Sequence, residues 1–465
     1  MKNSINNIKL KFLPIFLVSI IFVGCEDWLT VEPKGVVSPT NVTQLGEILI
    51  GNYDYLYSTR STMTMDDDFS VNNEVYGAFS EIDRNAYRWE PIYGPGDRDL
   101  DYKDYYAQIY NANYVLELID GAPLNGETVS RRDNVKAEAL TIRGYAYLQM
   151  VNIYGAHYNA STAAADMAIP LVLSTQPIQL PRSSVADIYD QIESDLLTSL
   201  ELYSDNLVND VRTESTRPGA LGLLARMYLY KGDWNKALTY ATEALESYNT
   251  LYNYNDYTKS TSEDVRVALS NENIESVFFR RGSNGYSKGS NVFTVNSDLL
   301  TLFDSNDLRY DFFIEADGNG NYIYAPINTQ NTTPLTGIQT PELYLIKAES
   351  YARLGNITEA MDALASLRAN RLDRNAFSTQ QSFDNAVRLS ASNNTEAIQL
   401  VVEERRRELM FQSLRWYDMK RYVELDEYNP TITRTVEGQT YSLKKGSDQW
   451  VVDISPDNKD FNPLL

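Results

Sequence analysis

Two clusters of aromatic and polar residues carry the side-chain types that could bind a ligand. The first runs from Arg84 to Asp97 and the second from Arg280 to Asn291. Tyr and Trp offer broad, rigid faces at low entropy cost, while Arg and Asn provide directional hydrogen bonds. This combination suits a sugar ring, and it suits an extended peptide nearly as well. The expected ligand residues are Arg88, Trp89, Tyr93, Arg281, Asn284 and Tyr286, with a core position for Trp89 as the open alternative.

Catalytic and metal-binding chemistry find little support in the residue types. The chain has one His and one Cys, which excludes a multi-His or Cys-based zinc site. A Ser/His/Asp triad would need His157, for which we expect a solvated or hydrogen-bonded place on the surface. Paired acids such as those at 66–68 are common among 63 carboxylates, and glycoside hydrolysis needs two that flank a cleft. We therefore expect no enzyme activity, no metal and no cofactor.

Acidic side chains outnumber basic ones over the 465 residues, and the formal charge is −22. A nucleic-acid partner would require a basic stripe facing its phosphates, and no segment supplies one. Apolar residues make up 43% of the chain, which is enough for a folded core and argues against disorder. The negative charge then indicates a solvated surface and points to no particular ligand.

The N-terminus has the pattern of a bacterial export signal. Lysines precede the apolar stretch Phe12–Val23, which is shorter than the roughly 20 residues that a membrane span needs. The stretch Phe22–Cys25 resembles a lipobox. We expect residues 1–24 to be a signal peptide and Cys25 to be lipidated, so that acyl chains anchor the protein. Residues 25–45 then form an extended tether.

The elements that must position the two clusters are mostly helices. Residues 135–154 and 187–203 show apolar side chains at three- and four-residue spacing. A pattern of small residues around a Tyr and a Gly occurs at 225–244 and again at 348–367. This spacing is typical of tetratricopeptide hairpins, in which Gly supplies the left-handed turn between two helices. We expect the hairpins to stack into one scaffold, with 135–203 as a third, degenerate hairpin.

Residues 51–110 and 250–340 break the helical pattern. They are rich in Tyr, Asn, Asp, Gly and Ser, which is typical of loops and turns. Irregular segments of this length are usually functional, and both candidate clusters overlap them. The sequence predicts a mostly α fold, with a tetratricopeptide-like scaffold and long loop-rich insertions.

Several stretches, in this order, resemble the SusD/RagB family of surface lipoproteins. They are Cys25–Leu29, Ile109–Leu116, Ala137–Gly155, the hairpins at 217–244 and 341–371, and Glu403–Leu409 with Arg415–Arg421. The chain departs from the family at Gln412-Ser413, where Glu-Gly is usual, and this puts a local ion pair in doubt. The resemblance implies an N-terminal SusD-like helical region at 46–250 and a C-terminal SusD/RagB region at 251–465.

The resemblance also implies a function. The protein would be lipid-anchored in the outer membrane and exposed at the cell surface. It would capture an oligosaccharide or polysaccharide and pass it to a SusC-like TonB-dependent transporter. Peptide capture, as in RagB-like members, is the first alternative, followed by a repeat scaffold without a ligand and by a surface glycosidase.

The charged segment Glu403–Arg421 is interpreted as a structural, salt-bridged helix. Helical spacing predicts ion pairs between Glu403 and Arg407 and between Arg405 and Glu408, and such pairs contribute only tenths of a kcal/mol when exposed. We do not expect these glutamates to be catalytic.

Overall fold

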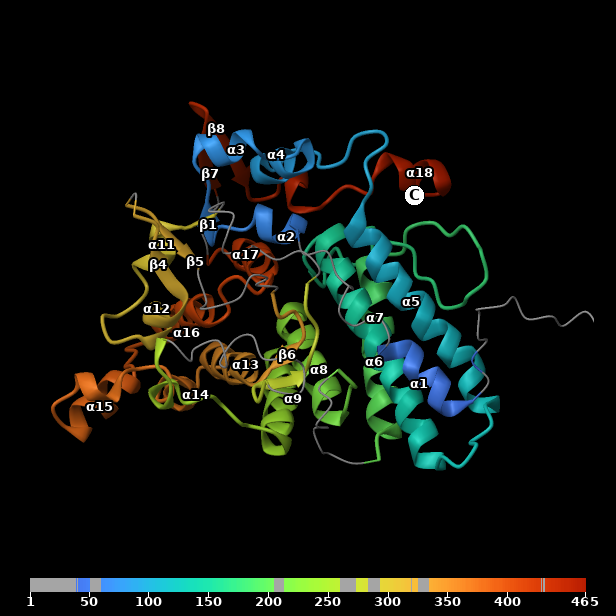
Figure 1. Ribbon diagram of the computed structural model, residues 1–465, viewed down its shortest axis with the longest axis horizontal. Helices are drawn as coiled ribbons and strands as arrows, with labels where there is room; N and C mark the ends of the chain where they lie inside the picture. Colours follow the sequence, from blue (N-terminus) through green and yellow to red (C-terminus); the bar gives the residue numbers. More distant parts are fainter. Residues whose placement is uncertain are drawn as a thin grey trace, which may run out of the picture. The chain divides into compact units, whose positions relative to one another are not determined.

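Long helices follow one another through most of the chain and pack side by side (Figure 1). Each contacts the next in this order, and α9 contacts α13 across the intervening insertion. The predicted stacking of helical hairpins into one scaffold is therefore confirmed. The helices are α5 (Leu100–Leu118), α6 (Val129–Tyr154), α7 (Val185–Leu202), α8 (Arg217–Lys231), α9 (Trp234–Ser247), α13 (Thr340–Arg353), α14 (Ile357–Arg368) and α16 (Asn394–Glu408).

The computed structural model describes most, but not all, of the chain. The leader and Cys25 lie outside the described residues, as do Asn284 and Tyr286. Contacts keep Thr40–Leu465 in one compact unit, and the division into regions at residue 250 stays a prediction. No described helix has the length and apolar character that crossing a membrane requires. The described residues are 39, 41–50, 60–204, 213–259, 273–282, 293–318, 320–324, 334–427, 429 and 431–465.

The ends of the scaffold helices follow from local sequence. Gly232 (φ 75°) and Gly355 (φ 86°) adopt the left-handed conformation between the paired helices, as the repeat pattern predicted. Ser184 and Asp187 form a capping box at the start of α7, which satisfies otherwise unpaired amide groups of its first turn. Helix α6 begins six residues earlier than the apolar spacing indicated, because Thr128 caps it by accepting a hydrogen bond from the Arg131 amide.

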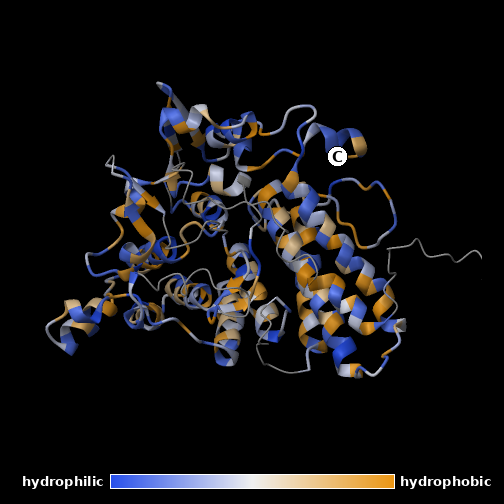
Figure 2. Cartoon of the chain, in the orientation of Figure 1, coloured by the Kyte–Doolittle hydropathy of each residue, from blue (hydrophilic) through white to orange (hydrophobic). Residues whose placement is uncertain are grey.

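Apolar side chains gather where α1 (Val42–Ile50), α5, α6 and α7 pack together (Figure 2). Buried ion pairs accompany this core. Arg143 on α6 bonds Asp195 on α7 at 2.7 and 2.8 Å, and Arg226 on α8 bonds Glu342 on α13 at 2.5 and 2.8 Å. Charged groups can be buried when each one is paired and hydrogen-bonded, and these pairs tie successive helices of the scaffold together.

Outside the scaffold the elements are short. The segment 51–110, predicted to be irregular, contains α2 (Arg60–Met65), α3 (Asn73–Gly77), α4 (Glu81–Arg88) and the first half of α5. Helices α2, α3 and α4 have eight residues or fewer, so each is too short for its apolar spacing to show in the sequence. The predicted tether is also shorter than expected, since α1 begins at Val42.

A small antiparallel sheet joins the N-terminal part to the insertion before α13. Its order is β1–β3–β5–β4, with Phe69 opposite Val295, Thr294 opposite Ile323 and Glu315 opposite Ile323. The strands are β1 (Phe69–Ser70), β3 (Thr294–Val295), β4 (Ile314–Ala316) and β5 (Tyr322–Tyr324), and α11 (Ser297–Leu300) and α12 (Leu308–Phe313) lie between β3 and β4. A second sheet pairs β2 (Ser276–Phe278) with β6 (Ile338–Gln339).

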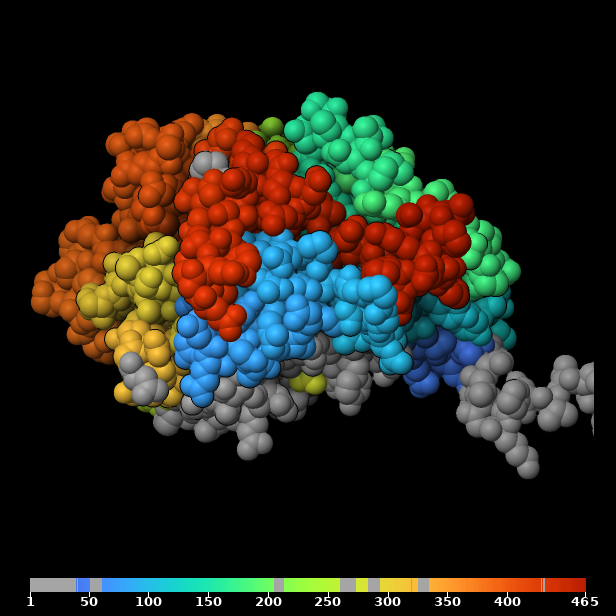
Figure 3. Space-filling view, turned by 90° about the horizontal axis from the view of Figure 1, so that it is seen from above, coloured from blue at the N-terminus to red at the C-terminus, as the bar shows by residue number. Residues whose placement is uncertain are grey.

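The C-terminal segment lies against residues 60–98, at the other end of the sequence (Figure 3). Arg434 donates hydrogen bonds to the backbone carbonyls of Thr64, Met65, Asp66 and Tyr87. The segment contains α17 (Arg415–Glu424), the hairpin β7 (Thr431–Val436) and β8 (Gln439–Lys444), and α18 (Pro456–Phe461). The short helix α15 (Gln380–Val387) lies away from it, next to α14 (Figure 1). Single 3-10 turns occur at Ile119–Gly121, Tyr254–Asp256, Arg374–Ala376 and Asp448–Trp450.

The segment Glu403–Arg421 is a buried ion network, as the structural interpretation requires, although its partners differ from those predicted. Glu404 pairs at 2.7 Å with Arg309, Arg368 and Arg407. Arg405 bonds Asp418 at 2.7 Å. Glu403 instead accepts a hydrogen bond from Gln399. The predicted pairs were wrong because helical spacing alone does not choose among neighbours: Glu403 and Glu404 bond other residues of α16, while Arg405 bonds Asp418 on α17.

Candidate ligand-binding site

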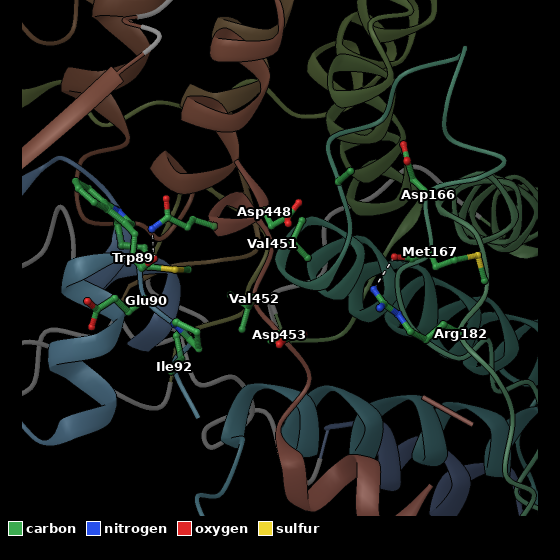
Figure 4. A pocket seen from close by; sticks show the side chains of 14 residues that line it. Trp89, Glu90, Ile92, Asp166, Met167, Arg182, Asp448, Val451, Val452 and Asp453 are labelled. Carbon is green, nitrogen blue, oxygen red and sulfur yellow. Dashed lines mark hydrogen bonds between the residues drawn. The ribbon is translucent and has the colours of Figure 1, made fainter. Parts of the chain in front are cut away.

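A cavity of about 470 Å³ opens where three segments distant in sequence meet (Figure 4). The segments are the end of α4 with the loop that follows it, the loops that carry Asp166 and Arg182, and residues 448–453 after the β7–β8 hairpin. Apolar residues of all three line it, among them Ile92, Met167, Val451 and Val452.

The chain conformation at the end of α4 shapes one side of this cavity. Ser80 caps the start of α4, and Trp89 ends it with φ 57°, which turns the chain toward residues 90–92. The Trp89 indole donates a hydrogen bond to the Met65 carbonyl at 2.9 Å, and Gln449 donates one to the Trp89 carbonyl at 2.7 Å. These bonds fix the position of the loop relative to the C-terminal segment.

Trp89 itself occupies the core position that the sequence left as the alternative. Its side chain is 2% exposed, and the Arg434 guanidinium lies over its ring at 4.4 Å from the centroid. Trp89 lines the cavity, but its ring is buried, so neither ring face is accessible to a ligand. The structure therefore does not support stacking of a ligand on Trp89.

Arg88 and Tyr93, the other two predicted residues of the first cluster, are engaged within the protein. Arg88 bonds Asn85, Glu81 and Glu90 at 2.5, 3.2 and 2.8 Å. The Tyr93 hydroxyl lies 3.4 Å from the Ser61 hydroxyl. Neither residue lines the cavity, so their predicted role as ligand residues has no geometric support there.

Of the residues predicted from the second cluster, the structure describes Arg281. Arg281 forms an isolated antiparallel bridge with Leu335, next to the β2–β6 sheet, and it does not line the cavity. Asn284 and Tyr286 lie outside the described residues. The first cluster therefore contributes Trp89, Glu90 and Ile92 to this cavity, whereas Arg281, the described residue predicted from the second cluster, does not line it.

The polar lining of the cavity consists mainly of carboxylates: Glu90, Asp166, Asp448 and Asp453. Arg182 is the basic residue of the cavity lining. Its Nε and Nη2 donate hydrogen bonds of 2.6 Å to the carbonyls of Ala168 and Met167, a contact visible in Figure 4. Burial lowers the pKa of Arg182, and the negative charge of Asp453 opposes that effect.

Most of these lining residues were missed by sequence reasoning. Asp166 and Met167 stand in an Ala-rich loop, and residues 448–453 follow a β-hairpin near the C-terminus. Neither segment is aromatic-rich or shows a binding motif. Only the packing of the C-terminal segment against α4 brings them together, and no signal within either segment could have indicated it.

The arrangement suits binding better than catalysis. Apolar walls can cover the C–H face of a sugar ring, and carboxylates accept hydrogen bonds from hydroxyls. His157 lies away from this cavity and lines a smaller one of about 150 Å³. It is half-buried rather than solvated, and burial, with the charges of Lys420 and Arg421, lowers its pKa to about 3. Within the described ranges no group of three or more His, Cys, Asp and Glu residues could hold a metal ion.

Solved structures share this fold along nearly the whole chain. A SusD-like carbohydrate-binding protein from Bacteroides vulgatus has a TM-score of 0.68 at 21% identity, over 92% of this chain and 98% of that one. A SusD superfamily protein from Bacteroides fragilis has a TM-score of 0.71 at 19% identity, over 92% and 99%. The helical scaffold with its inserted sheets is therefore the SusD fold.

Sequence comparisons lead to the same family. Residues 27–229 match a family model described as starch-binding associating with outer membrane, and residues 324–464 match the SusD family model. The SusD-like protein P25 of Formosa agariphila is 24% identical over 280 residues, which is 54% of this chain. The match spans about half of that relative, 48% of its length. The chain belongs to the SusD/RagB family.

Proposed function

We propose that the protein is a cell-surface lipoprotein that captures an oligosaccharide or polysaccharide and passes it to a SusC-like TonB-dependent transporter. The observation that carries this proposal is the cavity between α4, the 166–182 region and residues 448–453. Its volume of about 470 Å³ lies within the range of roughly 300–1,000 Å³ that is common for small-molecule sites. The family description as starch-binding supports a glycan as its occupant.

Capture at this site requires no bond cleavage. Ile92, Met167 and Val451 would contact apolar C–H faces, while the carboxylates of Asp166 and Asp448 would accept hydrogen bonds from sugar hydroxyls. Each hydrogen bond to a charged group contributes about 1.5–3 kcal/mol. A few such contacts give modest affinity, which suits a protein that must release its ligand to a transporter.

The membrane attachment would come from lipidated Cys25, which resembles the acceptor of a lipobox. Stable anchoring by lipid alone takes two acyl signals, because a single acyl chain binds a membrane only weakly and reversibly. The family description, which includes association with the outer membrane, supports this location.

The test is a calorimetric screen of neutral plant, algal and animal glycans against the protein from Glu26 onward. For a bound glycan, Asp166→Ala with Asp448→Ala should weaken binding at least about tenfold, because two hydrogen-bond acceptors are lost. The matched control is Glu246→Ala with Glu359→Ala, which removes two exposed acids on α9 and α14 that do not line the cavity.

Three results would contradict the proposal. Equal affinity in the cavity variant and the control would place the glycan elsewhere. Binding of peptides without glycans would favour the peptide alternative. Release of reducing sugars during incubation would indicate a glycosidase.

A further inference from the structure

We infer that the cavity selects neutral or amine-bearing glycans and rejects chains that carry carboxylate or sulfate groups. This inference rests on the proposed function and names its substrate class. Two observations support it: the charged side chains that line the cavity, and the basic partners that neutralise some of the carboxylates and leave others unpaired.

Two of the four lining carboxylates have a basic partner. Glu90 pairs with Arg88 at 2.8 Å. Asp453 pairs with Lys459 at 3.4 Å, and its charge also acts on Arg182. Each of these acids therefore contributes little net charge to the cavity.

Arg182 is the group that an anionic sugar would use, and one of the two bidentate edges of its guanidinium is occupied. Its Nε and Nη2 already donate to the carbonyls of Ala168 and Met167 at 2.6 Å. An arginine that recognises a carboxylate or sulfate usually offers two parallel N–H groups to it. The Nε–Nη2 edge is therefore engaged by the backbone, and the single positive charge of Arg182 faces a lining that contains four carboxylates.

Asp166 and Asp448 remain. Neither forms an ion pair within 4.0 Å with any basic side chain in the part of the chain that the structure describes. Asp448 is exposed and Asp166 is half-buried, and Figure 4 shows them on two different segments that line the cavity. Their uncompensated charges make the cavity negative, in a chain whose formal charge is already −22.

A negative group in the ligand would approach these two carboxylates. Like charges at about 6 Å repel with an energy that, near a protein surface, corresponds to at least roughly a tenfold loss of affinity. A hydroxyl would instead donate a hydrogen bond to either carboxylate, and a protonated amine would form an ion pair with it.

The test compares matched glycans that differ in charge, by calorimetry at 50 mM salt with the protein from Glu26 onward. The pairs are methyl-esterified and de-esterified oligogalacturonides, unsulfated and sulfated galactan oligosaccharides, and acetylated and deacetylated chito-oligosaccharides. In the galacturonide and galactan pairs, if binding is measurable, the anionic member should bind at least about tenfold more weakly than the neutral one. In the chito-oligosaccharide pair, the deacetylated, cationic member should bind more tightly.

Asp166→Asn with Asp448→Asn keeps the size and one acceptor oxygen of each side chain and removes both charges. The ratio of anionic to neutral affinity should rise at least about tenfold in this variant. The charge-matched control Glu246→Gln with Glu359→Gln should leave the ratio unchanged.

Equal or tighter binding of the anionic members by the wild-type protein would overturn the inference and leave the proposed function standing. An unchanged ratio in the Asn variant would also overturn it, because the discrimination would then come from shape. If no glycan in any pair binds, the proposed function fails, and the inference fails with it.

Discussion

Two residues between α16 and α17 hold a left-handed backbone although neither is glycine. Phe411 has φ 59° and Ser413 has φ 60°, a conformation that costs about 1–2 kcal/mol for an ordinary residue. The Ser413 hydroxyl is buried without a hydrogen-bond partner. The family's usual Glu-Gly is absent here, and Gln412 forms a neutral hydrogen bond with Gln339 at 3.3 Å. The departure seen in the sequence therefore affects the backbone as well as the charge.

We expect Ser413→Gly to stabilise the protein by about 0.5–1 kcal/mol, because relief of strain and loss of the unpaired hydroxyl exceed the added freedom of the unfolded chain. Urea unfolding followed by circular dichroism measures the change. Ser413→Ala is the control: it removes the hydroxyl and keeps the strain, so it should be less stable than the Gly variant. A Gly variant no more stable than wild type would contradict the strain argument.

Trp89 packs between Met65 and Arg434, so we expect Trp89→Ala to destabilise the fold by about 3–5 kcal/mol, as is usual for a buried Trp. The milder Trp89→Phe, which keeps an aromatic ring, should cost much less. Thermal and urea unfolding of both variants provide the measurement. Unchanged stability in Trp89→Ala would restore the interpretation of Trp89 as a ligand residue.

Glu138 on α6 should make stability fall as the pH rises. Burial, with the negative charge of Glu214, raises its pKa to about 8 from the ordinary 4.5. Between those values the folded protein holds a proton that the unfolded chain has released, so stability is greatest below pH 4.5 and is lost progressively up to pH 8. The contribution to the slope is about −1.4 kcal/mol per pH unit.

Glu138→Gln keeps the acceptor for the Ser215 amide and removes the titration. The difference in unfolding free energy between wild type and variant, measured at pH 5, 6, 7 and 8, should change with this slope. A difference that is independent of pH would show that the carboxyl titrates normally.

At the scale of the elements, the helices are joined by ion pairs of two kinds. The Arg226–Glu342 pair joins α8 to α13, and both side chains are at most 1% exposed. The Arg388–Asp362 pair has a similar separation, 2.6 Å, but each side chain is 53% exposed. Breaking a buried pair leaves an uncompensated charge in the interior, whereas water solvates the remaining partner of an exposed pair.

We therefore expect Glu342→Ala to destabilise the protein by about 3–5 kcal/mol and Asp362→Ala by less than about 1 kcal/mol. Chemical unfolding of the two variants in parallel gives the comparison. Similar effects in both would mean that the buried pair contributes no more than a surface pair does.

The scaffold could be predicted from the sequence because its signals are local. Gly232 and Gly355 mark the turns of two hairpins, and the apolar spacing of α6 and α7 needs no knowledge of distant residues. The cavity could not be predicted in this way. Asp166 and Asp448 are 282 positions apart and lie in short loops whose composition resembles that of any surface loop, so only tertiary packing identifies them. Aromatic clustering misled the prediction at Trp89, because burial in a core requires the same side chains as stacking on a sugar.

At the scale of the whole molecule, the predicted lipid anchor decides where the protein acts. We expect Cys25→Ser to abolish incorporation of radiolabelled fatty acid, because the thiol that would carry the acyl chains is removed. Labelling of cells that express wild type and variant measures this. The neighbouring Gly24→Ala substitution, which keeps a small residue before Cys25, should still be labelled. Undiminished labelling of the Cys25→Ser protein would exclude Cys25 as the site of lipidation.

Residues 60–98 pack against the C-terminal segment, and this contact also constrains the order in which the protein can fold during synthesis. Synthesis and export proceed from the N-terminus, and early segments usually fold first. Scaffold helices can therefore assemble early, but the cavity has no complete wall until residues 448–453 arrive. A chain that stops before Asp448 lacks this wall, and it also lacks Trp450, Val452 and Ile454, which are buried in the main core. Completion of the site and closure of the core therefore depend on the same short segment.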